Sequence, residues 1–193
     1  MPESRPGRRR IGLWLVGAKG GVATTLLVGL AALQRRAVEP IGLLTELEPF
    51  TRLDLVDFAD IVVGGHDIRG GRLADEARRM WTESRAIAPE LIAAADDFLT
   101  AVEGRLRPGT VLASGERIRG LADDAAAVTV ETPRQAIARV QADIEAFAAA
   151  ERLERVVVVN VASTEPPPER PIPPDFAAVD RLLDDPTACP LPT

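Results

Sequence analysis

Short apolar runs alternate with amphipathic stretches along the first two thirds of the chain. Residues 11–16 are almost entirely apolar and have the length of a buried strand. Residues 24–36 carry leucines at helical spacing and end in Arg35 and Arg36, which suit the negative end of a helix dipole. A second short apolar run follows at residues 41–45. The pattern therefore predicts a strand, a helix and a second strand.

The same alternation continues downstream. Residues 156–161 show no polar alternation before Asn160, which is typical of a strand buried on both faces of a parallel sheet. Strands are also predicted at residues 60–68 and 110–113, and helices within residues 72–104, where Pro89 opens a new one, and over residues 133–150. This order predicts an α/β fold, a Rossmann-like doubly wound parallel sheet that is incomplete, with a Pro-rich C-terminal tail.

The composition of the chain changes near its ends. Residues 1–10 form a basic tail, residues 11–165 carry the alternating pattern, and residues 166–193 are rich in proline. Nine of the 16 prolines of the chain fall in residues 165–193, where only residues 176–183 offer a short helix. We therefore expect one domain over residues 11–165, followed by a linker.

Charge and residue counts exclude several classes of function. A net charge of −6 gives little support to nucleic-acid binding. One cysteine, Cys189, and one histidine, His66, leave no disulfide and no metal site to expect. No uncharged apolar stretch is long enough to cross a bilayer, and no signal peptide is visible. We expect a soluble, cytoplasmic protein without a membrane partner.

A glycine loop follows the first predicted strand. Residues 16–25 read Val-Gly-Ala-Lys-Gly-Gly-Val-Ala-Thr-Thr and contain Lys19, the only lysine of the chain. A strand, a glycine turn and a helix N-terminus together make an anion site, because the backbone can approach a phosphate closely and the first helical N–H groups point at it. The loop predicts the phosphate end of a nucleotide site.

Two nucleotide chemistries and a plain turn compete for this loop. A deviant P-loop of partition-type ATPases needs a second lysine directly before the threonines, but Thr24 stands there and no other lysine exists. A dinucleotide loop needs only glycines and a helix dipole, although Lys19 replaces the second glycine of the usual spacing. A tight strand–helix turn that binds nothing is the third interpretation. The residues favour the dinucleotide.

Acidic residues at the ends of the predicted strands are candidates for the ribose of such a cofactor. Glu46 lies about 25 residues after the glycine turn, where a Rossmann fold often places this acid, and Glu48 is an alternative. Asp67 follows Gly64, Gly65 and His66 at a strand end and is a second candidate. The choice between Glu46 and Asp67 stays open at this point.

Three segments together resemble one family. Gly-Leu-Trp-Leu-Val-Gly-Ala-Lys-Gly-Gly-Val-Ala-Thr-Thr at 12–25, Val-Gly-Gly-His-Asp-Ile at 63–68 and Val-Val-Asn-Val-Ala-Ser-Thr-Glu-Pro-Pro at 158–167 are similar, in content and order, to segments of the inositol-phosphate synthases. His66 stands where many members carry tryptophan, and Ser163 where many carry asparagine. The resemblance covers most of residues 10–167.

The resemblance implies an NAD-dependent isomerase of inositol and phospholipid biosynthesis. Such enzymes convert glucose 6-phosphate to myo-inositol phosphate by internal oxidation, enolisation, aldol cyclisation and reduction. The resemblance implies pyrophosphate contacts from the glycine loop, a ribose contact from Asp67 and further cofactor contacts from two strand ends. The implied cofactor-binding residues are Gly17, Lys19, Gly20, Gly21, Val22, Asp67, Ala113, Ser114, Ala162, Ser163 and Thr164.

The chain also departs from the family. Members are considerably longer, and their phosphate-binding and enolate-stabilising lysines lie in a later catalytic domain. We therefore expect a truncated or split cofactor-binding N-terminal part, with no catalytic residues of its own and with glucose 6-phosphate as substrate only when the missing domain is supplied. Family members are homo-oligomers, and the oligomeric state of this chain stays open. The alternatives are the partition-type ATPase and a non-catalytic Rossmann protein that regulates a full-length synthase.

Overall fold

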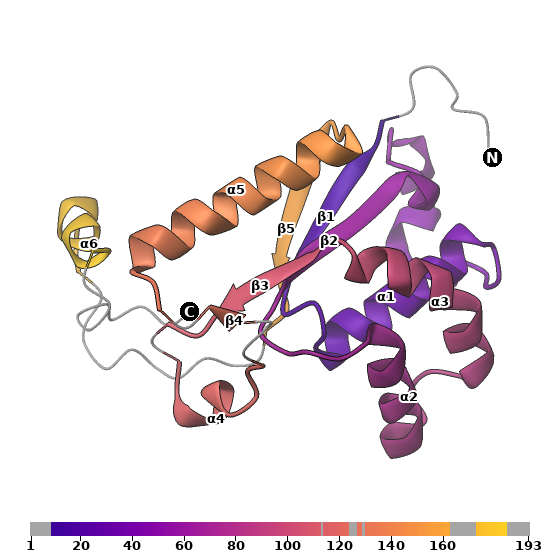
Figure 1. Ribbon diagram of the computed structural model, residues 1–193. Helices are drawn as coiled ribbons and strands as arrows, with labels where there is room; N and C mark the ends of the chain where they lie inside the picture. Colours follow the sequence, from indigo (N-terminus) through magenta and orange to yellow (C-terminus); the bar gives the residue numbers. More distant parts are fainter. Residues whose placement is uncertain (1–8, 113, 124–126, 129, 163–172, 185–193) are drawn as a thin grey trace.

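A five-stranded parallel sheet forms the centre of the computed structural model (Figure 1). The structure describes residues 9–112, 114–123, 127–128, 130–162 and 173–184. The strand order is β4-β3-β2-β1-β5, and each pair of neighbouring strands is parallel. The strands are β1 (Ile11–Val16), β2 (Ile61–Asp67), β3 (Leu106–Thr110), β4 (Ala127–Val128) and β5 (Arg155–Asn160).

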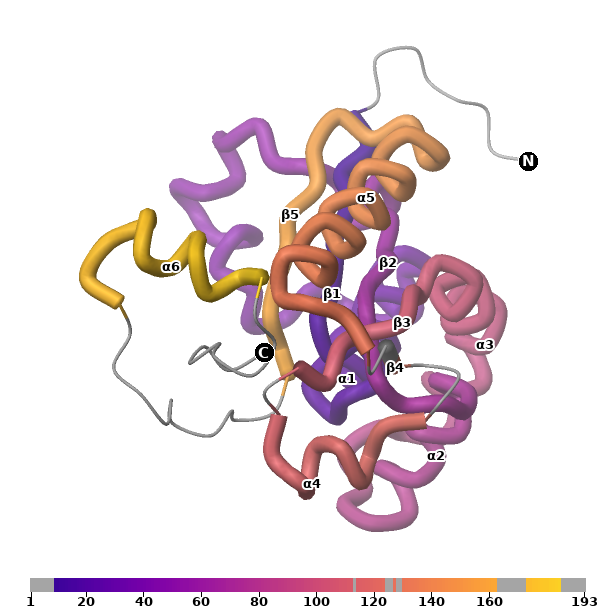
Figure 2. The backbone as a smooth tube through the Cα atoms, turned by 60° about the vertical axis from the view of Figure 1, so that its left-hand side comes forward, coloured from indigo at the N-terminus to yellow at the C-terminus, as the bar shows by residue number. Residues whose placement is uncertain are grey.

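Helices cover both faces of this sheet. Helices α1, α2 and α3 lie on one face and α5 lies on the other, as the two views show together (Figures 1 and 2). The helices are α1 (Gly21–Gln34), α2 (Leu73–Ser84), α3 (Pro89–Glu103), α4 (Glu116–Arg119), α5 (Pro133–Glu151) and α6 (Phe176–Leu182). This arrangement confirms the Rossmann-like doubly wound prediction, with the topological switch between β1 and β5.

Several predicted elements are confirmed at nearly their expected bounds. Helix α5 begins at Pro133 behind the N-cap Thr132, whose hydroxyl accepts from Gln135 N while the Gln135 side chain accepts from Thr132 N. Pro89 opens α3, and a short helix begins at Phe176. No described helix is both long and apolar enough to cross a membrane.

The strand predicted at residues 41–45 is wrong. This segment forms turns and a 3-10 helix, Leu44–Glu46, followed by two more, Phe50–Arg52 and Phe58–Asp60. Both sides of β1 are already paired, with β2 and with β5, so no position beside β1 is left for a strand at 41–45. The apolar residues of this segment remain exposed instead, among them Ile41, Leu44 and Leu47.

The strand predicted at 110–113 also lies elsewhere. Strand β3 ends at Thr110, and it includes Pro108 and Gly109, two residues that disfavour a strand. Pro108 is tolerated because it is the last β3 residue paired with β2, and its carbonyl accepts from Arg139 Nη1 at 2.7 Å. A Cβ on Gly109 would lie 2.8 Å from Ile68 Cγ2, so the close approach of β2 requires glycine there.

Strand β5 is less buried than its sequence predicts. It pairs with β1, and no other described strand pairs with it. Val157 is 45% exposed and Val158 is 50% exposed, so the expectation of burial on both faces is wrong. An apolar run alone does not distinguish an edge strand from a central one when the neighbouring elements are not known.

The core is divided by the sheet into two layers of unequal size. On the face of α1–α3, Leu15 of β1 and Val63 of β2 join the large cluster, which includes Leu27 and Leu99. Trp14, whose neighbour Leu15 points to the opposite face, is fully buried against Phe147 of α5, with ring centroids 5.0 Å apart. The indole fits because Gly64 lies beneath it, where a Cβ would approach Trp14 Cζ3 to 2.9 Å.

A pair of glycine substitutions tests this packing. Gly64→Ala should lower the free energy of unfolding by about 1–3 kcal/mol, because the new methyl group meets the indole and the ring of Phe147. Gly29→Ala is the matched control in α1, where a Cβ meets nothing within 4 Å, and should raise stability by about 0.5–1 kcal/mol. Urea unfolding measures both, and equal effects of the two substitutions would contradict the predicted packing.

Candidate functional site

The glycine loop joins β1 to α1 and lies at the switch point of the sheet. Gly17 N and Ala18 N both donate to the carbonyl of His66, at 2.9 and 3.1 Å, which ties the loop to the end of β2. Gly17 has a φ of +84°, and a Cβ on it would lie 2.7 Å from Ala162 Cα. Only glycine fits, because the segment leaving β5 passes directly against the loop.

The start of α1 presents free backbone donors. Gly20 is the N-cap, and the first helical bond runs from Thr24 N to Gly20 O at 2.8 Å. The N–H groups of Gly21, Val22 and Ala23 donate to no acceptor among the described residues. With the positive end of the helix dipole, these three donors form a site for an anion.

Asp67 fixes the loop from the end of β2. Its Oδ2 accepts from Lys19 N at 2.6 Å, and its Oδ1 accepts from Arg69 N at 2.8 Å. The carboxylate is buried, with Arg69 Nε 3.5 Å from Oδ1. Asp67 therefore joins the glycine loop to the loop at residues 68–72, in the position where a Rossmann fold places its ribose-binding acid.

The side chain of Lys19 is also occupied. Its ammonium donates to the carbonyl of Arg69 at 2.9 Å and to that of Gly71 at 2.8 Å. Sequence spacing places this lysine in the loop but does not give the direction of its side chain. The structure directs Lys19 across to the loop that follows β2.

The remaining predicted residues fall into four groups. Ala162 lies against Gly17, as described above. Ser114 is buried beyond the end of β3, and its hydroxyl donates to Val111 O at 2.7 Å, within its own turn. Ala113, Ser163 and Thr164 lie outside the described residues. Glu46 is exposed in a 3-10 helix and has no described contact with the glycine loop.

Arg69 was missed by the sequence reasoning. Its Nη2 lies 3.8 Å from the position that a Cβ on Gly20 would occupy, so the guanidinium faces the N-cap of α1. It also lines an open cavity beside the loop, together with Lys19, Gly70, Gly71, Arg72, Asp75, Glu76 and Arg79. The sequence could have pointed to Arg69, because it directly follows the segment at residues 63–68 and the chain has only one lysine to offer as an alternative cation.

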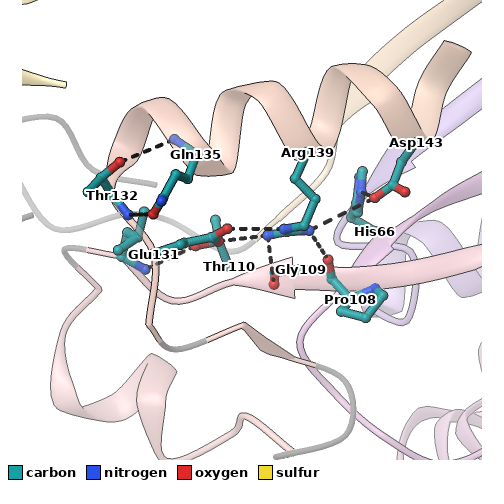
Figure 3. Close-up of polar contacts among 10 residues, drawn as sticks. His66, Pro108, Gly109, Thr110, Glu131, Thr132, Gln135, Arg139 and Asp143 are labelled. Carbon is teal, nitrogen blue, oxygen red and sulfur yellow. Dashed lines mark hydrogen bonds and ion pairs between the residues drawn. The ribbon is translucent and has the colours of Figure 1, made fainter. Parts of the chain in front are cut away.

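His66 points away from this site, toward α5. Trp14 Nε1 donates to His66 Nδ1 at 2.9 Å, so the ring proton sits on Nε2, which lies 3.0 Å from Asp143 Oδ2 (Figure 3). Burial lowers the pKa of His66 below its ordinary value of 6.5, against the raising effect of Asp143. The neutral imidazole is thus a link between sheet and helix.

Arg139 extends this link along α5. It donates to both carboxylate oxygens of Glu131 and to the carbonyl of Pro108, and its Nη1 lies 3.9 Å from Asp143 Oδ2 (Figure 3). These contacts hold α5 over β2 and β3. Among the described residues, no group of three or more His, Cys, Asp or Glu side chains is placed to hold a metal ion.

The chain matches a family model and a curated relative. Residues 11–175 match the NAD-binding domain model described as myo-inositol-1-phosphate synthase. The chain is 31% identical over 175 residues to inositol-3-phosphate synthase 1 of Bacteroides thetaiotaomicron, a match that covers 84% of this chain and 38% of the relative. The chain thus spans well under half of that relative's length.

Solved structures show the same fold. Inositol-3-phosphate synthase from Caenorhabditis elegans is similar with a TM-score of 0.68 and 19% identity, over 85% of this chain and 36% of that one. A myo-inositol-1-phosphate synthase-related protein from Thermotoga maritima is similar with a TM-score of 0.56 and 19% identity, over 93% of this chain and 41% of that one.

The buried imidazole predicts a dependence of stability on pH. Because the pKa of His66 is lowered in the folded state, the unfolded chain binds a proton first as the pH falls below 6.5. The free energy of unfolding should therefore fall progressively below pH 6.5 as far as the lowered pKa of His66. His66→Gln, which can still bond to Trp14 and Asp143, should flatten this dependence.

Urea titrations at several pH values measure this effect. The pKa values of Glu76 and Glu151 are lowered from 4.5, so the slope between pH 6.5 and 4.5 is the part of the titration that tests His66. If the free energy of unfolding depends on pH in His66→Gln as it does in the wild type, the conclusion that the buried imidazole is neutral is wrong.

Proposed function

Because the chain belongs to the myo-inositol-1-phosphate synthase family, we propose that it is the cofactor-binding part of an inositol-3-phosphate synthase. The single observation that carries this proposal is the set of three N–H groups at the start of α1 that donate to no described acceptor, beside a loop that glycine alone can form. NAD is the cofactor that the matched family model indicates. Its pyrophosphate is the anion that these donors would receive.

The residues present fit this cofactor. Gly17 permits the sharp turn, and Gly20 and Gly21 keep side-chain atoms away from the N-terminus of α1. We propose that Asp67 also reaches the adenine ribose, and that Ala113, Ser114, Ala162, Ser163 and Thr164 lie along the cofactor toward its nicotinamide. Thr24 Oγ1 is buried in the first turns of α1 without a described hydrogen-bond partner.

The proposed reaction converts glucose 6-phosphate to myo-inositol phosphate. NAD, when bound, would supply the hydride acceptor for the first oxidation and the hydride donor for the final reduction. Between these steps, proton loss next to the new ketone and ring closure require cations that stabilise negative oxygen. The chain has a single lysine, Lys19, which two carbonyls already engage, so we propose that these cations come from a further catalytic domain.

The ATPase alternative receives no support from the site. The position that a P-loop would fill with its second lysine is Thr24, and this residue is fully buried. A lysine at this position would have to leave the core to reach a triphosphate. We further propose that the protein works in the cytoplasm, as its single cysteine and its cofactor suggest.

A calorimetric titration tests the nucleotide. We expect the purified chain to release or absorb heat with NAD⁺ and to show none with ATP and Mg²⁺. Gly20→Val should abolish the NAD⁺ signal, because a Cβ there already meets Gly17 O at 3.1 Å and a branched side chain would cover the free donors. Gly29→Ala serves as the folded control. Binding of ATP alone would overturn the dinucleotide proposal.

An activity assay tests the proposal that the catalytic cations come from a further domain. The chain alone, given glucose 6-phosphate and NAD⁺, should form no inositol phosphate, because we assign the cations that stabilise the enolate to the further catalytic domain. Chromatographic detection of the product provides the measurement. Product formed by the pure chain would show that catalytic groups lie within these 193 residues.

A further inference from the structure

The positive charges around the glycine loop have unequal access to a ligand. Lys19 is the residue that the sequence singles out, yet its ammonium donates to two backbone carbonyls, at 2.9 and 2.8 Å. Arg72 and Arg79, which line the same cavity, face acidic partners, Asp96 at 3.7 Å and Glu76. Arg69 differs from these three cations because its guanidinium faces Gly20 at the N-terminus of α1.

Both the backbone N–H and the backbone carbonyl of Arg69 form hydrogen bonds. Its N–H donates to Asp67 Oδ1 at 2.8 Å, and its carbonyl accepts from the Lys19 ammonium. Both partners come from the elements that form the anion site, β2 and the glycine loop. The direction in which the Arg69 side chain leaves the chain is therefore fixed by the site itself.

The guanidinium of Arg69 keeps its outer face free. Its Nε is 3.5 Å from Asp67 Oδ1, and its Nη1 and Nη2 have no hydrogen-bond acceptor among the described residues. Glu76 is the nearby alternative acceptor, but Arg79 holds both of its oxygens and, with Arg69, lowers its pKa. The side chain is 30% exposed, with Nη2 3.8 Å from the Cβ position of Gly20.

On the basis of the proposed dinucleotide site, we propose that Arg69, and not Lys19, is the cation that binds the cofactor's pyrophosphate. Two parallel Nη donors match two phosphate oxygens, an arrangement that an ammonium cannot supply. The free N–H groups of α1 would hold the pyrophosphate from the other side. Lys19 is then a positioning residue, which acts on the ligand through the loop that carries Arg69, and Asp67 holds that loop in addition to its proposed ribose contact.

Binding assays with three ligands separate these roles. NAD⁺ and ADP carry a pyrophosphate, and adenosine does not. In Arg69→Gln the dissociation constants of NAD⁺ and ADP should rise about tenfold or more, the effect of a lost charge-assisted hydrogen bond, while that of adenosine stays within about twofold. Arg72→Gln is the matched control from the same loop and cavity, and should leave all three dissociation constants within about twofold.

A double variant separates binding from positioning. Lys19→Met should weaken NAD⁺ binding less than Arg69→Gln does, and the double variant should lose no more than Arg69→Gln alone, because Lys19 acts through Arg69. Additive losses, or a larger loss in Lys19→Met, would assign the phosphate contact to Lys19 and overturn the inference.

Three further outcomes are distinguishable. If Arg69→Gln binds NAD⁺ as the wild type does, the inference is wrong and the dinucleotide site stands. If Arg69→Gln weakens adenosine and NAD⁺ equally, Arg69 only shapes the loop, which also overturns the inference. If the wild-type chain binds neither NAD⁺ nor ADP, the proposed function itself fails. Circular dichroism of each variant verifies that the fold is intact.

Discussion

The close contact between three strand ends is the constraint on which the site depends. The backbone that leaves β1 passes between the ends of β2 and β5 with no space for a side chain: at Gly65 a Cβ would lie 2.2 Å from Leu15 O, and at Gly17 it would lie 2.7 Å from Ala162 Cα. The His66 carbonyl then accepts two consecutive N–H groups of the loop. This packing orients the first turn of α1 so that its free donors open at the switch point of the sheet.

The sequence predicts the first strand and the long helices well, and it predicts the strands away from β1 poorly. Strand β1, helix α1 and helix α5 follow from signals within their own residues: an apolar run, leucines at helical spacing, and a proline in the first turn. Such local signals survive in the fold because nothing distant opposes them. The failures at residues 41–45 and at β3 have the opposite origin, since whether an apolar run becomes a strand depends on a vacant neighbour.

The candidate site shows the same division. The glycine loop can be read from the sequence because positive φ and close contact demand glycine. The directions of long side chains cannot be read in this way. Lys19 is conspicuous in the sequence but turns to two carbonyls, and Arg69 lies outside every motif yet faces Gly20. Which cation is left free depends on Asp67, Glu76 and Arg79, three residues whose contacts form only in the folded chain.

The buried indole of Trp14 has a further use as an optical label. Its Nε1 donates to His66 Nδ1, which could no longer accept this bond in a protonated ring, so the environment of the Trp14 fluorophore changes with the charge of His66 and with the packing of Phe147 of α5. The second tryptophan, Trp81, lies in α2 beneath the guanidinium of Arg85, on the opposite layer. The two helical layers of this fold thus carry separate intrinsic fluorophores, which allows the loosening of each layer to be followed without an attached dye.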